Sequence, residues 1–189
     1  MAARKLAGGS DRWRMASADG GEFAEMCDRQ AGVLTVAAAC LNMGEAAVRW
    51  RLSSGRWRRV CHGVVTQSGP LTEEQRLWAA VLAAGDGAVL AGLTAARLDG
   101  LSGFDERRVH LLIPASRQVR KALPDVAVHR SVLLGSGDVH PARLPPRTRL
   151  ARWLVDAAGW ATTDRLARAV LAAGVQQRLE HRSSSPGWA

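Results

Sequence analysis

Residues 45–66 read EAAVRWRLSSGRWRRVCHGVVT, and this stretch indicates the fold. Its first nine residues predict a short helix that ends at Ser54-Gly55, a pair typical of turns. Residues 56–60 then alternate polar and apolar side chains, residues 61–63 can turn, and residues 64–66 are β-branched, so a β-hairpin is predicted. A hairpin directly after a helix of this kind is the wing of a winged helix.

A second short helix is predicted immediately before this stretch. Thr35 is a natural N-cap residue, and the alanine-rich segment that follows extends to Leu41. Residues 42–44 are a turn signal. Two short helices joined by a tight turn make a helix-turn-helix. We therefore predict a winged helix-turn-helix domain over residues 22–69, with a first helix whose apolar face contains Phe23, Met26 and Cys27.

The sequence leaves open how the helix over residues 45–53 is rotated about its axis. One apolar stripe that could face the core is Val48 with Leu52, four residues apart, and the competing stripe is Ala47 with Trp50. The first alternative places three polar residues on the flanks and the outer side of the helix: Arg49, Arg51 and Ser53.

Positive charge is concentrated in two blocks of the chain. The formal net charge is +9, and 24 of the 26 basic residues are arginine. Residues 45–60 hold five arginines against Glu45, and residues 143–182 hold eight arginines against three acidic residues. A general abundance of arginine explains the total but not five arginines between positions 49 and 59, which favour binding to a polyanion. The second block is more simply the solvated face of helices.

In a winged helix-turn-helix, the second helix of the motif lies in the major groove of DNA while flanking groups contact phosphates. Arg56 and Arg58 are predicted to share one face of the first hairpin strand, with Trp57 packed inward on the other. The alternative is a winged helix that only docks other proteins. Seven residues are the predicted DNA contacts: Thr35, Arg49, Arg51, Ser53, Arg56, Arg58 and Arg59.

Residues 70–180 predict a second domain that contains both helices and strands, which makes the fold class α+β. Thr72 and Gln75 have the spacing of a capping box at the start of its first helix. Helices are predicted over residues 71–85, 94–98, 148–158 and 164–173, and strands over residues 88–91, 109–113 and 126–130. Core candidates in the last two helices are Leu150, Leu154, Leu166 and Val170. Residues 1–21 and 181–189 are expected to be disordered.

The chain lacks the residue patterns that support common catalytic mechanisms. It has no Gly-x-Ser-x-Gly elbow, phosphate-binding loop or His-Glu-x-x-His helix, and its histidines and cysteines are scattered. We therefore expect no enzymatic activity, metal or cofactor. The longest uncharged run, residues 30–44, is too short to span a bilayer, and the first residues lack the apolar stretch of a secretory signal. Three cysteines without a close pair indicate a reduced, cytoplasmic protein.

The ordered segments resemble the AbiEi-like antitoxin family, the transcription-regulating half of type IV toxin–antitoxin systems. The likeness covers roughly residues 25–175. Its N-terminal part is carried by Gly32-Val33-Leu34-Thr35, Val48-Arg49-Trp50-Arg51-Leu52, Gly55-Arg56-Trp57-Arg58-Arg59-Val60 and His62-Gly63-Val64-Val65. Its C-terminal part is carried by Gln75-Arg76-Leu77-Trp78, Ala95-Ala96, Leu98, Gly100-Leu101, Val109-His110-Leu111, Leu144-Pro145-Pro146-Arg147-Thr148 and Leu154-Val155-Asp156.

This resemblance implies an N-terminal winged helix-turn-helix that binds promoter DNA and represses its own operon. It also implies a C-terminal domain that counteracts a nucleotidyltransferase-like toxin without necessarily binding it. Two alternatives stay open: a non-catalytic protein-interaction module, and the remnant of a nuclease-linked protein that binds DNA without sequence preference. The second alternative arises because many relatives continue into a very-short-patch-repair-like nuclease domain, so this chain would be a truncated relative.

Overall fold

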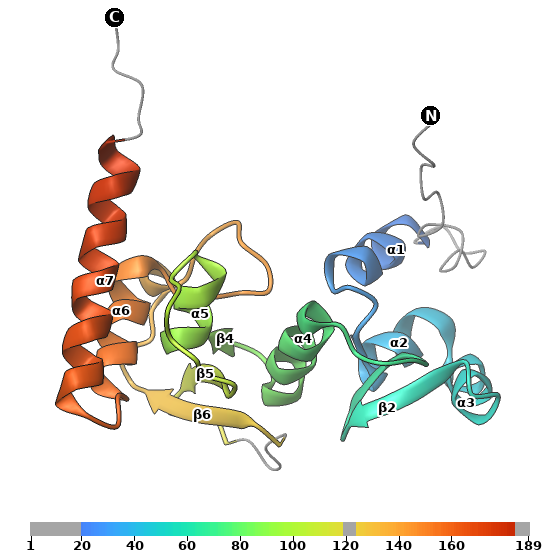
Figure 1. Ribbon diagram of the computed structural model, residues 1–189. Coiled ribbons are helices and arrows are strands. Elements are labelled where there is room, and N and C mark those ends of the chain that lie inside the picture. The colour runs from blue at the N-terminus through green and yellow to red at the C-terminus, as the bar shows by residue number, and fades with distance from the viewer. Residues whose placement is uncertain (1–19, 119–123, 184–189) are drawn as a thin grey trace, which may run out of the picture. The chain divides into compact units, whose positions relative to one another are not determined.

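The computed structural model describes residues 20–118 and 124–183 (Figure 1). Within these ranges the chain folds into α-helices and two three-stranded sheets, which confirms the mixed α+β class. The chain divides into two compact units between Ala83 and Ala84. Most of the two terminal segments for which disorder was expected lies outside the described residues. Helix α1 begins at Gly20 and helix α7 continues to Ser183, so each helix extends a few residues into a segment for which disorder was expected.

The first unit opens with helices α1 (Gly20–Arg29), α2 (Val36–Met43) and α3 (Glu45–Ser53). The predicted N-cap of α2 is confirmed, because the Thr35 hydroxyl accepts a hydrogen bond of 3.1 Å from the backbone N–H of Ala38. Gly44 separates α2 from α3 with φ of +82°, a backbone conformation that favours glycine. The chain can therefore turn sharply and start α3 at the next residue.

The predicted hairpin is also present, as strands β2 (Trp57–Cys61) and β3 (Val64–Gln67). The two strands are antiparallel, and Arg58 lies opposite Thr66. Strand β1 (Leu34–Thr35) pairs with the other edge of β3, which makes the sheet order β1-β3-β2. The apolar side chains of helices α1 to α3 and of this sheet form one core, whose buried members are Phe23, Cys27, Leu34, Ala39, Val48, Trp57 and Val65.

Helix α4 (Glu73–Ala84) belongs to this first unit rather than to a separate domain that starts at residue 70. Its capping box is confirmed, since Thr72 and Gln75 each accept a hydrogen bond from the other's backbone N–H. The Gln75 side chain also donates to the carbonyl of Ala31 at 2.9 Å. On the inner face of α4, Trp78 packs with Val33 and other buried residues. These contacts attach α4 to the first compact unit, which extends to Ala83.

The second unit contains strands β4 (Val89–Leu90), β5 (Val109–Pro114) and β6 (Val126–Ser131). Their order is β4-β5-β6, with β4 antiparallel and β6 parallel to β5. Helices α5 (Gly92–Leu98), α6 (Leu150–Gly159) and α7 (Asp164–Ser183) complete the unit, and a 3₁₀ turn spans Ser136–Asp138. Strand β5 ends at Pro114, as its sequence predicts.

The core of the second unit lies between α5, α6 and α7. Trp153 is buried against Ala95 and Ala96 of α5. Of the predicted core residues, Val170 is fully buried, and Leu150 and Leu154 pack against this cluster. Leu166 is half-buried. Helix α7 extends ten residues beyond the predicted end at Ala173. No helix in the described part of the chain has both the length and the apolarity that crossing a membrane requires.

Candidate nucleic-acid interface

The structure determines the rotation of helix α3. Val48 is buried in the core of the first unit, and Leu52 packs against the same cluster. Trp50, by contrast, is 50% exposed. The first of the two predicted stripes therefore faces the core, and the alternative with Trp50 inward is wrong. Half of the large apolar surface of Trp50 is therefore left in water.

The exposed Trp50 ring has a partner from the next element. The guanidinium carbon of Arg56 lies 4.6 Å from the centroid of the Trp50 ring, within the range of a cation–π contact. Arg56 directly precedes β2, so this contact joins the start of the hairpin to the outer side of α3. It also restricts the Arg56 side chain, which is otherwise exposed.

Arg51 is held in a different way. Its guanidinium carbon lies 5.5 Å from the centroid of Trp57, and its Nη1 donates to the carbonyl of Ala47 at 3.4 Å. Trp57 is buried, as predicted. Arg51 is half-buried, so its side chain packs against Trp57 while its charge stays near the surface.

The two arginines inside strand β2 differ in their surroundings. Arg59 is exposed, whereas Arg58 is half-buried and its Nε has no hydrogen-bond partner within the described residues. Arg58 lies opposite the buried Thr66, whose hydroxyl donates to the carbonyl of Gly32. Arg56 and Arg58 therefore do not form one equally exposed pair. The alternation of side chains along the strand could not predict this difference in exposure, because helix α4 packs against part of the sheet.

The remaining predicted contacts lie on the helices. Arg49 is 79% exposed, and it forms a long ion pair of 4.0 Å with Glu45, one helical turn away. Ser53 is exposed, and its hydroxyl donates to the carbonyl of Trp50. The Thr35 hydroxyl is the N-cap of α2 described above. Thr35 therefore has a structural role whether or not it also contacts a ligand.

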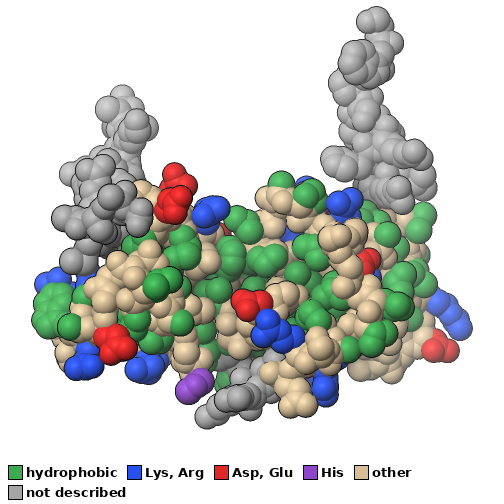
Figure 2. Space-filling model, turned by 180° about the vertical axis from the view of Figure 1, so that it is seen from behind, with side chains coloured by type: hydrophobic (Ala, Val, Ile, Leu, Met, Phe, Trp, Pro, Cys, Tyr) green, Lys and Arg blue, Asp and Glu red, His purple; other side chains and the backbone are tan. Residues whose placement is uncertain are grey.

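We use the name arginine surface for the exposed side chains of α3 and the start of the hairpin: Arg49, Trp50, Arg56 and Arg59. Glu45 is the one acidic residue between positions 45 and 60. An exposed surface of this composition attracts polyanions, and the ring of Trp50 limits the freedom of one cation in it. Basic side chains lie beside exposed hydrophobic ones on the face of the molecule drawn in Figure 2. In the described residues, no group of three or more His, Cys, Asp or Glu side chains could hold a metal ion.

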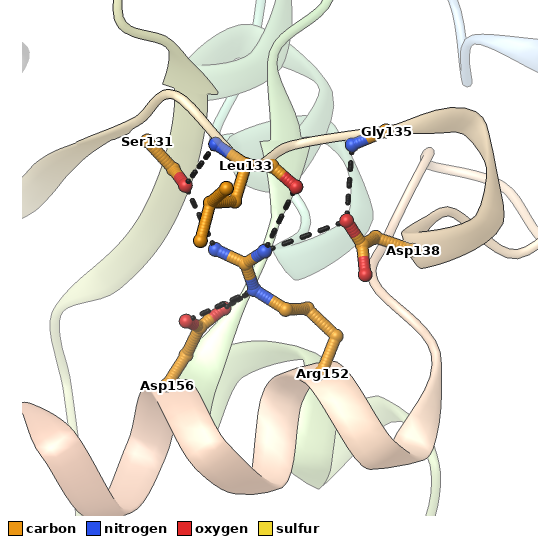
Figure 3. A network of polar contacts seen from close by, with 6 residues as sticks. All are labelled: Ser131, Leu133, Gly135, Asp138, Arg152 and Asp156. Carbon is orange, nitrogen blue, oxygen red and sulfur yellow. Dashed lines mark hydrogen bonds and ion pairs between the residues drawn. The ribbon is translucent and has the colours of Figure 1, made fainter.

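The second unit has a network of polar contacts centred on Arg152 of α6 (Figure 3). Its Nε donates to both carboxylate oxygens of Asp156, at 3.1 and 2.9 Å. Its terminal nitrogens reach the Ser131 hydroxyl at 3.2 Å, the Leu133 carbonyl at 3.4 Å and Asp138 at 3.4 Å. One arginine thus connects α6 to the loop that follows β6. No pattern in the sequence indicates this role, since only the three-dimensional fold brings these segments together.

A second such cluster surrounds Asp99 at the end of α5. Its carboxylate accepts a hydrogen bond of 3.0 Å from the indole nitrogen of Trp153 and forms ion pairs with Arg143 at 3.2 Å and Arg147 at 3.1 Å. Arg147 is buried, so its charge requires this partner. Three arginines of the second basic block, Arg143, Arg147 and Arg152, therefore pair with carboxylates. Arg147 is buried and Arg152 half-buried, so these two are not members of a solvated face, whereas Arg143 is exposed.

Two histidines of the second sheet, His110 on β5 and His129 on β6, stack with the ring of Trp160. The rings of His129 and Trp160 are 3.4 Å apart between centroids and within 5° of parallel, and His110 lies next to them. His110 Nδ1 is 3.2 Å from His129 Nε2, and its Nε2 is 3.6 Å from Glu106. Burial, and secondarily the proximity of His110, lowers the pKa of His129 to about 4. His129 is therefore neutral at physiological pH and acts as a packed ring.

Comparison of the sequence with models of known protein families gave no match, and comparison with curated proteins also gave none. The function is therefore inferred from the geometry and from the resemblance given above.

Proposed function

We propose that this protein binds double-stranded DNA through helix α3 and the β2–β3 hairpin, which together with α2 act as a winged helix-turn-helix. The element order supports this interpretation: two short helices joined at Gly44, then a hairpin whose second strand pairs with β1. The single observation that carries the proposal is the arginine surface, in which Arg56 is stacked on the exposed Trp50.

The roles of the side chains follow from their positions. Helix α3 enters the major groove and places Arg49 and Ser53 near base edges or phosphates. Arg56 and Arg59 neutralise phosphates on either side of the groove. The Trp50 ring restricts the Arg56 side chain before DNA arrives, so less side-chain entropy is lost on binding. Arg51 and Arg58 are less exposed, and they contribute mainly to the field around the interface.

The resemblance to AbiEi-like antitoxins extends this proposal. On that basis the protein is a cytoplasmic transcriptional regulator that represses its own promoter, and its second unit counteracts a nucleotidyltransferase-like toxin. The arginine surface supports the DNA-binding part of this description. The antitoxin part is supported by the resemblance alone.

Fluorescence anisotropy tests the proposal, with the full chain titrated onto its own upstream DNA and onto scrambled DNA at two salt concentrations. The test variant replaces Arg49, Arg56 and Arg59 by alanine. The control variant replaces Arg107, Arg165 and Arg168, three exposed arginines of the second unit, and so removes the same charge. We expect the test variant to lose affinity and to lower the salt slope by up to about three units, one for each lost phosphate contact.

Each result has a defined meaning. Preference for the upstream fragment that survives the higher salt supports a sequence-specific regulator. Equal binding to both DNAs supports a basic surface without operator preference, as in the nuclease-linked alternative. If the test and control variants lose affinity equally, the arginine surface is not the interface. If the wild-type chain does not bind DNA, the exposed Leu41 and Trp50 favour the protein-docking alternative.

A further inference from the structure

Strand β6 is the outer strand of the sheet in the second unit. The strand order is β4-β5-β6, and β6 pairs with β5 along its whole length, from Val126 opposite Val109 to Ser131 opposite Pro114. Figure 1 shows β6 as the outermost arrow of this unit. One edge of β6 therefore has a pairing strand, and the other has none within the described residues.

The hydrogen bonds to β5 show which backbone groups of β6 point to the open edge. Val109 donates to the carbonyl of Asp125 at 2.8 Å, and Ala115 donates to that of Ser131 at 3.0 Å. In a parallel ladder, alternate residues direct both N–H and C=O to the same neighbour. The odd-numbered residues of β6 therefore bond to β5, and the N–H and C=O groups of Val126, Val128 and Arg130 point outward.

This edge lacks the features that usually prevent strands from pairing with other chains. Proteins protect open edges with proline, several charges, bulges or very short strands. Strand β6 has six residues in an unbroken register, no proline, and Arg130 as its single charged side chain. An unprotected edge of this kind is a template for one more strand.

The two residues that follow β6 expose apolar side chains. Val132 and Leu133 are 85% and 78% exposed. The backbone of Leu133 is nevertheless held in place, because its carbonyl accepts from Arg152 and its N–H donates to the Ser131 hydroxyl (Figure 3). The Arg152 network thus fixes the backbone of Leu133 beside the end of β6, while the apolar side chains of Val132 and Leu133 lie in water.

We propose that β6 pairs antiparallel with β6 of a second copy of this chain, about a two-fold axis at Val128. In this register Val128 lies opposite Val128 of the second copy, and Val126 opposite its Arg130. All three outward-pointing residues then exchange backbone hydrogen bonds with the partner strand. The charges are compatible, because each Arg130 faces a valine and not the other Arg130. His129 lies opposite Ala127 of the second copy, so the two histidines do not face each other either.

Sedimentation of the full chain over a concentration series tests this proposal. Val128→Pro removes one outward N–H and no bond to β5, and proline is tolerated at such edge positions. Val128→Thr is the matched control, since it is β-branched and keeps the N–H. We expect dimers for the wild type and for Val128→Thr, and monomers for Val128→Pro. Circular dichroism verifies that each variant is folded.

A pair of charge variants tests the register even if Val128→Pro does not fold. Val126→Glu places a carboxylate opposite Arg130 of the second copy, and Val126→Arg places a like charge there. Because the pair occurs twice about the axis, Val126→Glu should tighten the dimer and Val126→Arg should weaken it, each by about two- to thirtyfold in Kd. A wild-type chain that stays monomeric overturns the proposal. So does a folded Val128→Pro variant that still forms dimers, or a pair of charge variants that shift Kd in the same direction.

Discussion

The guanidinium carbon of Arg56 lies 4.6 Å from the centre of the Trp50 ring, and this contact couples the hairpin to helix α3. The two residues are six positions apart, across the Ser54-Gly55 turn. Neither is buried, so their contact contributes little to folding. Its effect is to orient a cation beside the helix that we propose enters DNA.

Replacing Trp50 by alanine should therefore weaken DNA binding more than it destabilises the fold. We expect a two- to fivefold loss of affinity, because ordering an unrestrained Arg56 on DNA costs about 0.5–1 kcal/mol more side-chain entropy. If Trp50 acts through Arg56, the Trp50→Ala/Arg56→Ala double variant should bind DNA about as weakly as Arg56→Ala alone. A double-mutant cycle by anisotropy measures this. Fully additive losses would show that the two side chains act independently.

Arg152→Ala should destabilise the second unit by about 2–4 kcal/mol, because it leaves the largely buried carboxylate of Asp156 without its charged partner. The loop after β6 should loosen as well, so the amide protons of Leu133 and Gly135 should exchange faster. Hydrogen exchange and thermal unfolding measure both effects. Arg149→Ala is the control, since Arg149 is exposed and its side chain makes one hydrogen bond, to Val139. An equal loss in both variants would contradict the role given to the network.

Gly92 combines a left-handed backbone conformation with a close aromatic neighbour. Its φ is +53°, and a Cβ at this position would lie 2.7 Å from Trp160 Cζ3. Gly92→Ala should thus cost about 2–4 kcal/mol, the sum of backbone strain and overpacking. Gly103 has φ of +88°, and a Cβ there would meet nothing within 4 Å, so Gly103→Ala isolates the strain at about 1–2 kcal/mol. Denaturant unfolding compares the two variants, and equal costs would exclude the clash with Trp160.

The stability of the second unit should fall as the pH is lowered from about 7 towards 4. The pKa of His129 is lowered from 6.5 to about 4 in the folded chain, mainly by burial. Between these values the unfolded chain binds a proton that the folded chain does not, which favours unfolding. Above pH 7 the His129 side chain is neutral in both the folded and the unfolded chain, so its contribution to the free energy of unfolding is constant. His129→Gln should flatten this part of the stability profile, as measured by thermal unfolding across pH. An unchanged slope would show that other groups cause it.

Local features of the fold could be predicted from the sequence. The caps at Thr35 and Thr72 and the hairpin predicted over residues 56–66 depend on neighbouring residues, and the structure confirms them, with the hairpin strands at Trp57–Cys61 and Val64–Gln67. The attachment of α4 to the first unit could not be predicted, because part of its contacts come from Ala31 and Val33, more than forty residues away. Periodicity carries no information about such contacts.

For the candidate site, the sequence determined which residue types are available: a cluster of arginines with Trp50 and Trp57 among them, on a helix and the strand after it. The tertiary structure decided which of them are accessible. Burial of Val48 turns Trp50 outward, and Trp50 then holds Arg56, while the sheet and its neighbours partly enclose Arg58. The physical reason is that side-chain exposure depends on what packs against each face. That packing is set by residues distant in the chain.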